Sequence, residues 1–128
     1  MIDGTTIIDF HGHTSSAESN GMKADPALMI RVLDAAGVDR ACVFCCDHPD
    51  GRTTNDLTAR IVKTHPDRFI GFGFVSPLLT PAAMRDELTR CFDELGFIGI
   101  KVYSNYFPWG YDAPHYYPIY EVADERGA

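Results

Sequence analysis

Short apolar runs alternate four times with segments of helical periodicity along this chain, and this rhythm constrains the fold more than any other feature of the sequence. The runs at residues 5–11, 40–46, 69–75 and 97–103 are rich in β-branched and aromatic residues, which favours strands. The segments that follow them carry apolar residues at helical spacing. Alternating strands and helices predict an α/β fold with a parallel sheet and crossover helices.

Capping residues indicate where the predicted helices begin and end. Asp25-Pro26 and Thr80-Pro81 each place an N-cap side chain before a proline at the first helical position. Gly37 and Gly96 are placed to end these two helices. The first helix is expected to bury one apolar face, formed by Leu28, Met29, Val32 and Leu33. The other two helices are expected at residues 55–63 and from about Pro118 to Gly127.

Two architectures share this rhythm, an open doubly wound sheet and a closed (β/α)8 barrel. No G-x-G-x-x-G motif follows the first predicted strand, and the sequence has no Gly-Lys-Ser or Gly-Lys-Thr phosphate loop. The nucleotide-binding versions of the open sheet therefore have no support. With 128 residues, the chain has room for one domain.

The composition excludes several classes of protein. Hydrophobic residues make up 45% and charged residues 23%, which excludes a disordered tail and a membrane span. Eighteen acidic residues against eleven Lys and Arg give a net charge of −7, so nucleic acid is not an expected partner. The N-terminus lacks the basic and long apolar regions of a signal peptide, so a cytoplasmic protein is expected.

The four cysteines are expected to be free thiols, because the cytosol is reducing. Cys42 and Cys45 have the spacing of a redox pair and lie within an apolar run. Residues three apart in a strand point to opposite faces, so these two sulfurs would diverge. Buried, unreactive cysteines are the prediction.

Two histidines at the end of the first predicted strand carry the chemistry. His11 and His13 flank Gly12, and residues two apart share one face of a strand, with Cα atoms about 6.5 Å apart. Imidazole nitrogens bind Zn²⁺ at about 2.0–2.1 Å, so both rings can converge on one ion. The carboxyl ends of strands are where α/β folds build their sites. The motif predicts a divalent metal site, with zinc the expected ion; a polar strand-to-loop junction is the alternative.

The segment Ile8-Asp9-Phe10-His11-Gly12-His13 resembles the first-strand signature of the amidohydrolase superfamily, whose members are metal-dependent (β/α)8 barrels. Residues 33–41, 66–73, 94–103 and 117–121 resemble its amidohydrolase-related branch, which includes aminocarboxymuconate-semialdehyde decarboxylase-like enzymes. The resemblance implies about four βα units of a TIM barrel, so residues 1–128 would form its N-terminal half as one partial barrel domain. The family's other site residues, two histidines and an aspartate, would lie beyond Ala128.

The resemblance implies that His11 and His13 are the metal ligands. Asp9 shares their face by alternation, so it is expected one layer below them in the barrel, in contact with the ligands or in an ion pair rather than bound to the metal. Asp47 and His48 follow the second strand, where they either line the site or belong to a solvated loop.

Lys101, near the end of the fourth predicted strand, has three interpretations: a carbamylated bridge between two metals, a contact to a substrate carboxylate, or an ion pair in the barrel. An aromatic stretch at residues 103–111 follows it and includes Tyr103 and Trp109. This stretch can form the wall of a substrate pocket, cover a subunit interface or pack as loop core. Tyr103 and Trp109 are therefore candidate substrate contacts.

The resemblance implies that the parent protein is a metal-dependent hydrolase, in which metal-activated water attacks a carbonyl-type centre of a small molecule. A non-oxidative decarboxylase, or carboxy-lyase, on the same site is the alternative, as is an inert half-barrel. The 128-residue chain alone is expected to be inactive, because a base and further ligands would lie elsewhere. Its open strand edges predict a homo-oligomer.

Overall fold

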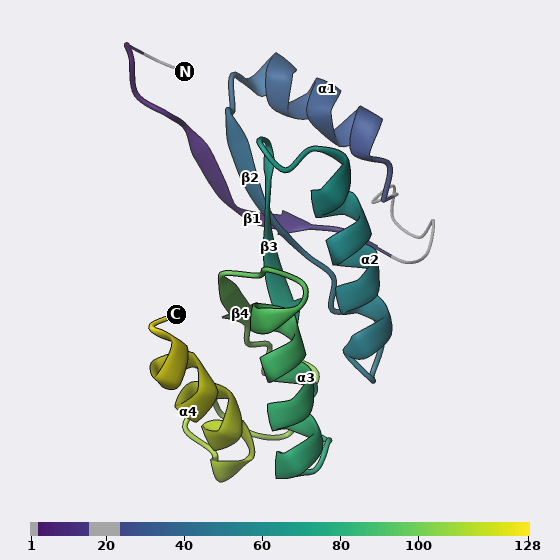
Figure 1. The fold of residues 1–128 in the computed structure, drawn as a ribbon. Coiled ribbons are helices and arrows are strands. Elements are labelled where there is room, and N and C mark those ends of the chain that lie inside the picture. The colour runs from purple at the N-terminus through teal and green to yellow at the C-terminus, as the bar shows by residue number, and fades with distance from the viewer. Residues whose placement is uncertain (1–2, 16–23) are drawn as a thin grey trace.

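A computed structural model describes residues 3–15 and 24–128 of the chain. The elements in chain order are β1 (Ile8–His13), α1 (Pro26–Ala36), β2 (Arg40–Phe44), α2 (Arg52–Thr64), β3 (Phe69–Phe74), α3 (Pro81–Asp93), β4 (Gly99–Lys101), a 3-10 turn (Pro114–Tyr116) and α4 (Tyr117–Arg126). All strand pairs are parallel, in the order β1-β2-β3-β4. Helices α1 to α3 lie along one side of the curled sheet, and α4 packs beside α3 (Figure 1). The predicted half-barrel of four βα units is confirmed.

Three of the four predicted helix caps are present, whereas α3 ends at Asp93 with Glu94 as its C-cap, two residues before the predicted Gly96. The Asp25 carboxylate accepts hydrogen bonds from the backbone N–H groups of Ala27 and Leu28, at 3.0 and 3.2 Å. Gly37 ends α1 in the left-handed region, at φ 69°. Thr80 accepts a hydrogen bond at its hydroxyl from the Ala83 N–H, at 3.2 Å.

No helix within the described part of the chain is long and apolar enough to cross a membrane.

The strands differ from their predicted ranges because each extends only as far as its pairing partner. The strand expected at residues 5–11 begins at Ile8 and continues through His13, where β2 still pairs with it. The strand expected at residues 97–103 is paired only over Gly99–Lys101, against the end of β3. Before it, the Phe97 ring fills the space beside Gly71, where a Cβ would lie 2.3 Å from that ring.

The apolar face of α1 also differs from the expected one. Leu33 is buried, and Met29 and Ile30 pack against the same cluster. Leu28 and Val32, which were expected to be buried, are 38% and 58% exposed. The prediction is wrong for these two residues because α1 contacts the sheet through the face that carries Met29, Ile30 and Leu33. No described residue covers the opposite face.

The apolar core lies between the sheet and the helices, in two main clusters. Beneath α1 and α2, the buried members are Leu33, Ala41, Val43, Ile61 and Phe69. Between α3 and α4, they are Val75, Met84, Leu88, Tyr116, Ile119 and Val122. Since the outward side chains of β2 and β3 pack into the first cluster, the opposite side chains of these strands face the inside of the half-barrel.

A buried polar network joins α2, β3 and α3. The Asn55 side chain donates to the Phe74 carbonyl and accepts from the Phe74 N–H, both at 2.8 Å, and it also donates to Glu87 at 2.9 Å. Arg90 donates twice to the same Glu87 carboxylate, at 2.6 and 2.9 Å. Asn55 is 0% exposed and Glu87 4% exposed. The network therefore fixes the carboxyl end of β3 against two helices.

An irregularity in β1 controls which way its side chains point. Asp9 pairs with Ala41 and Gly12 with Val43, so two residues of β1, Phe10 and His11, lie opposite one residue of β2. Such a bulge changes the facing of every later side chain in the strand. A Cβ on Gly12 would lie 2.7 Å from the Cys42 carbonyl oxygen, so the bulged backbone has no room for a side chain there.

Replacing Asn55 by Ala should lower the free energy of unfolding by about 2 to 4 kcal/mol, because the Phe74 N–H and Glu87 lose a buried partner. Urea unfolding followed by circular dichroism measures the change. Arg60→Ala, an exposed change on the same helix, is the control and should stay within about 0.5 kcal/mol of the parent chain. Equal effects of the two changes would contradict the role of Asn55.

Gly12→Ala should destabilise the chain by about 1 to 3 kcal/mol, because the added Cβ has to displace backbone of β2. Gly110→Ala is the matched control, since its added Cβ would meet only the exposed Asp112 carboxylate. Thermal melts of both variants provide the comparison. A Gly12 variant that melts like the parent chain would show that β1 does not need the close approach to Cys42.

Candidate metal centre

The imidazoles of His11 and His13 meet at the carboxyl end of β1. Their Nε2 atoms are 3.1 Å apart, and both rings contact the ring of Phe44, with centroid distances of 5.3 and 4.5 Å. Two nitrogens that bind one ion at about 2.1 Å, with an angle of about 90 to 109°, lie about 3.0 to 3.4 Å apart. The observed separation therefore fits two ligands of a single metal ion.

The surroundings of His13 disfavour its protonated form. Partial burial, together with the nearby charges of His11 and Lys101, lowers the pKa of His13 below its ordinary value. Only a neutral imidazole nitrogen binds a metal ion. The surroundings of His13 therefore favour the form that a metal ion requires.

Asp9 does not share the inner face with the histidines, contrary to the expectation from simple alternation. Its register partner is Ala41, whose side chain packs toward the helices, whereas the partner of His13 is Phe44. The bulge after Asp9 causes this difference. The Asp9 carboxylate instead accepts a hydrogen bond from the backbone N–H of His11, at 3.0 Å.

Lys101 and Tyr103 lie beside the histidines at the same rim. Lys101 is the last residue of β4, and its Nζ atom is 5.0 Å from the centroid of the Phe44 ring and 5.4 Å from that of Tyr103. The Tyr103 ring in turn lies against Tyr106, with centroids 4.8 Å apart. The structure thus brings a cation and two aromatic rings to the side of the histidine pair, through contacts shared with Phe44.

Trp109 occupies a different environment. Its indole stacks on the imidazole of His115, with centroids 3.7 Å apart and planes 13° from parallel. It also packs against the α3–α4 cluster. Of the three interpretations of the aromatic stretch, packing as loop core therefore fits Trp109. No described contact joins Trp109 to the histidine pair.

A cavity of about 340 Å³ lies at the same rim, where β2 and β3 end. Its lining residues are Cys46, Asp47, His48, Pro49, Phe74, Tyr106 and Phe107. Asp47 and His48 thus lie at the rim where the sequence placed them. The His48 Nδ1 atom is 3.0 Å from the Asp50 carboxylate, which orients the imidazole. Sequence analysis did not identify Phe74 or Pro49 as lining residues, because neither residue type marks a site by itself.

The cysteines are free, as predicted, and three of the four are buried. Burial raises the pKa of Cys45 and of Cys91 to about 12, so these thiols stay protonated. The Cys45 thiol donates to the Asp47 carboxylate at 2.9 Å. Within residues 3–15 and 24–128, no group of three or more His, Cys, Asp or Glu is arranged to hold a metal. The described part of the chain therefore offers the two histidines as a partial ligand set.

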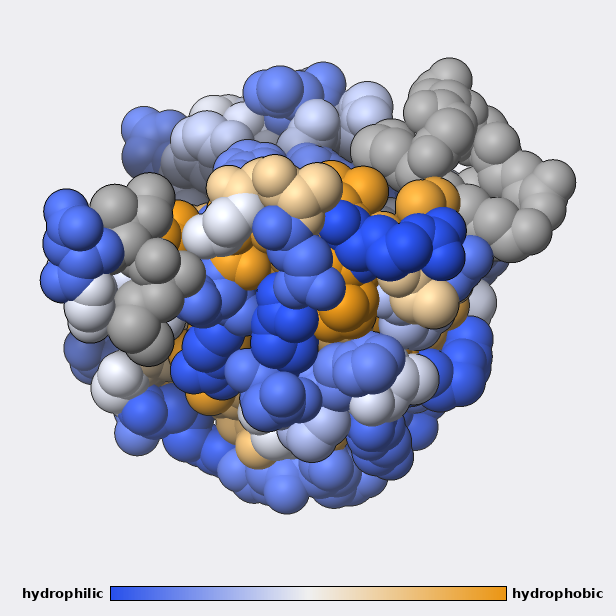
Figure 2. Space-filling view, turned by 90° about the horizontal axis from the view of Figure 1, so that it is seen from above, coloured by the Kyte–Doolittle hydropathy of each residue, from blue (hydrophilic) through white to orange (hydrophobic). Residues whose placement is uncertain are grey.

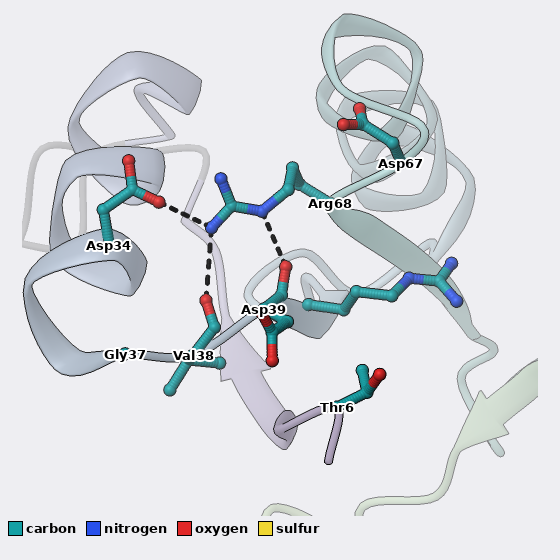
Figure 3. A pocket seen from close by; sticks show the side chains of 8 residues that line it. Thr6, Asp34, Gly37, Val38, Asp39, Asp67 and Arg68 are labelled. Atoms are coloured by element: carbon teal, nitrogen blue, oxygen red, sulfur yellow. Dashed lines mark hydrogen bonds and ion pairs between the residues drawn. The ribbon is translucent and has the colours of Figure 1, made fainter. Parts of the chain in front are cut away.

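A second cavity, of about 560 Å³, lies at the opposite rim, where the strands begin (Figure 3). Arg68 crosses it and donates to the Asp39 and Val38 carbonyls at 2.6 and 3.2 Å, and to the Asp34 carboxylate at 2.8 Å. Seen from above, this end of the molecule is mostly hydrophilic, with apolar side chains visible between the polar ones (Figure 2). Because Arg68 forms hydrogen bonds with all three of these partners, we interpret it as a structural link that joins α1 to the starts of β2 and β3 across this cavity.

Comparison with curated proteins identifies decarboxylases. The chain is 39% identical over 74 residues to 2-amino-3-carboxymuconate-6-semialdehyde decarboxylase of Dictyostelium discoideum. This match covers 58% of this chain and 20% of that protein. It is 40% identical over 80 residues to gamma-resorcylate decarboxylase of Rhodococcus jostii. This match covers 54% of this chain and 23% of that protein. The matched segment thus spans less than a quarter of either relative.

Solved structures share the fold. A 5-carboxyvanillate decarboxylase of Novosphingobium aromaticivorans, with bound manganese, superposes with a TM-score of 0.80 over 97% of this chain and 49% of that chain, at 22% identity. A dihydroxybenzoic acid decarboxylase of Polaromonas, with bound manganese and 2-nitroresorcinol, gives a TM-score of 0.76 at 23% identity, over 94% of this chain and 47% of that chain.

The chain therefore spans about half the length of these solved proteins, in agreement with four of eight βα units. Residues 8–128, from the first residue of β1 onward, match the sequence profile of the family described as Amidohydrolase. The match includes both histidines, Lys101 and the aromatic stretch. The chain belongs to the amidohydrolase family.

Proposed function

We propose that the protein containing this chain is a metal-dependent decarboxylase that removes CO₂ from a small carboxylic acid without oxidation. Residues 1–128 would form the N-terminal half of its catalytic barrel domain. The observation that carries the metal dependence is the 3.1 Å separation of the two imidazole Nε2 atoms, at the rim where barrel enzymes bind their substrates. The identity of the curated relatives as decarboxylases supports the choice of reaction.

The donor set of the site fits a divalent ion. His11 and His13 would hold it through neutral imidazole nitrogens, and Asp9 would steady the ligand segment through its hydrogen bond to the His11 N–H. Manganese bound to two proteins of the same fold supports a divalent metal, and imidazole nitrogens also suit zinc. When bound, the ion supplies a Lewis acid for negative charge on a carboxylate or phenolate oxygen.

The chain's own residues would bind and orient the substrate. Lys101 supplies positive charge beside the histidines, while Tyr103 and Tyr106 supply flat apolar surface. Such surfaces suit an aromatic or unsaturated acid, and the solved relatives include enzymes named for dihydroxybenzoate and carboxyvanillate. In the reaction, the bond between the ring carbon and the carboxylate carbon breaks, CO₂ leaves, and a proton takes its place on the ring carbon.

Decarboxylation is better supported than the hydrolysis expected first from the sequence. Both reactions use a metal site at this rim, so the histidine pair does not distinguish them. The difference lies in the relatives, since the curated proteins that align with this chain are decarboxylases. An aromatic cavity beside a cation also suits a stacked acid better than a tetrahedral hydrolytic intermediate.

Replacing His11 or His13 by Ala should weaken Mn²⁺ or Zn²⁺ binding by the 128-residue chain about tenfold or more, because each change removes one of two ligands. Isothermal titration calorimetry measures the affinity. His65→Ala, at the opposite rim, is the control and should leave the affinity unchanged. Unchanged binding in both His11 and His13 variants would remove this pair as the metal ligands.

The parent protein, loaded with Mn²⁺, should release CO₂ from 2,6-dihydroxybenzoate or 5-carboxyvanillate. The 128-residue chain alone should release none, because two histidines do not complete a catalytic metal shell. Trapping of labelled CO₂ measures both. Hydrolysis of lactones or amides by the parent protein, without CO₂ release from either acid, would overturn the proposal in favour of hydrolysis.

A further inference from the structure

We propose that Lys101 is the anion anchor of a ring-binding subsite. The ring would enter the cavity at the ends of β2 and β3, on the side where Cys46, Phe74, Tyr106 and Phe107 line it, away from the lining residues Asp47 and His48. The anchor would hold an anionic substituent of an aromatic ligand while the ring lies against Tyr103 and Tyr106. This inference deepens the proposed function and rests on it for the class of ligand, although the binding step itself needs no metal.

The ammonium group of Lys101 is held in place without being neutralised. It lies 5.0 Å from the Phe44 centroid and 5.4 Å from the Tyr103 centroid, so two rings position it through cation–π contacts. Across residues 3–15 and 24–128, no carboxylate forms an ion pair with it and no acceptor hydrogen-bonds to it. A positioned, half-buried cation with no counter-ion is suited to bind an anion.

The cavity continues from this cation. Tyr106 lines the cavity and lies against Tyr103, over which the Lys101 ammonium is placed. Cys46, another lining residue, is close enough that the charge of Lys101 opposes the rise in its thiol pKa caused by burial. At about 340 Å³, the cavity has the size of a small-molecule site. One ligand can therefore place its ring among the tyrosines and its charge at Lys101.

The overall charge of −7 does not attract anionic ligands, and salt screens its effect beyond about 8 Å, so a local cation has to favour such a ligand. A charge-assisted contact at Lys101 works over a shorter distance and is stronger than a neutral hydrogen bond. The anchor thus selects acids over neutral phenols of the same shape.

The test compares two ligands that differ by one carboxylate, 2,6-dihydroxybenzoate and resorcinol, on the metal-free 128-residue chain. NMR titration should show the acid binding about five- to tenfold more tightly than resorcinol. Lys101→Met should bring this ratio close to one and leave resorcinol binding unchanged, because the stem of the side chain is kept. Lys101→Arg should retain most of the preference.

Lys63→Met, which removes an exposed charge at the end of α2, is the matched control and should not change the ratio. The titration contains no metal ion, so a failed metal site and a failed anchor give different results. On the unmodified chain, the acid should shift the backbone amide signals of Cys46, Tyr103 and Tyr106, and added salt should weaken it more than resorcinol. A preference that survives in Lys101→Met, no measurable preference in the parent chain, or shifts confined to other surfaces would each overturn the proposal.

Discussion

The direction in which the side chains of β1 point depends on the one extra residue of its bulge, and the candidate site depends on that direction. If β1 continued regularly from the pairing of Asp9 with Ala41, His11 and His13 would point toward the helix layer with Val43. The bulge places Phe10 and His11 opposite a single residue, and after it both imidazoles face the inside of the half-barrel. The close approach of Gly12 to β2 is part of the same distortion. A local backbone irregularity therefore turns both imidazoles toward the inner face, where the candidate metal site lies.

The basic side chains at the two ends of the sheet have different kinds of partner. At the amino ends of the strands, Arg68 is bound to Asp34 and to two carbonyl groups, so its charge is used to hold elements together. At the carboxyl ends, Lys101 has rings around it instead of carboxylates. The buried Asn55–Glu87 network fixes the end of β3 from the helix side, which leaves its inner side for the cavity. The amino-end rim is thus held together by Arg68, whereas the carboxyl-end rim is fixed from the helix side and has the candidate site on its inner side.

The sequence predicts what depends on local pattern. Asp25, Thr80 and Gly37 mark helix ends through their own side-chain or backbone chemistry, and the histidine pair follows from a spacing of two at a strand end. Tertiary contacts decide the rest. The facing of Asp9 depends on the bulge, and the exposure of Val32 depends on which side of α1 meets the sheet. Asn55 reads as an ordinary helix residue until Phe74, nineteen positions away, is placed beside it.

If His11 and His13 bind a metal ion, closing the barrel and completing the shell of metal ligands would be coupled. The inner face carries Phe10, 68% exposed and packed edge-to-face on Phe72, directly before the two histidines. A further segment or a second copy that covered these rings would also lie beside His11, the next residue of β1, where it could offer further ligands. Burial of the apolar face would then raise metal affinity, and by linkage the metal would stabilise the closed form. The homo-oligomer expected from the open edges stays a prediction, and it would have to satisfy both requirements with one surface.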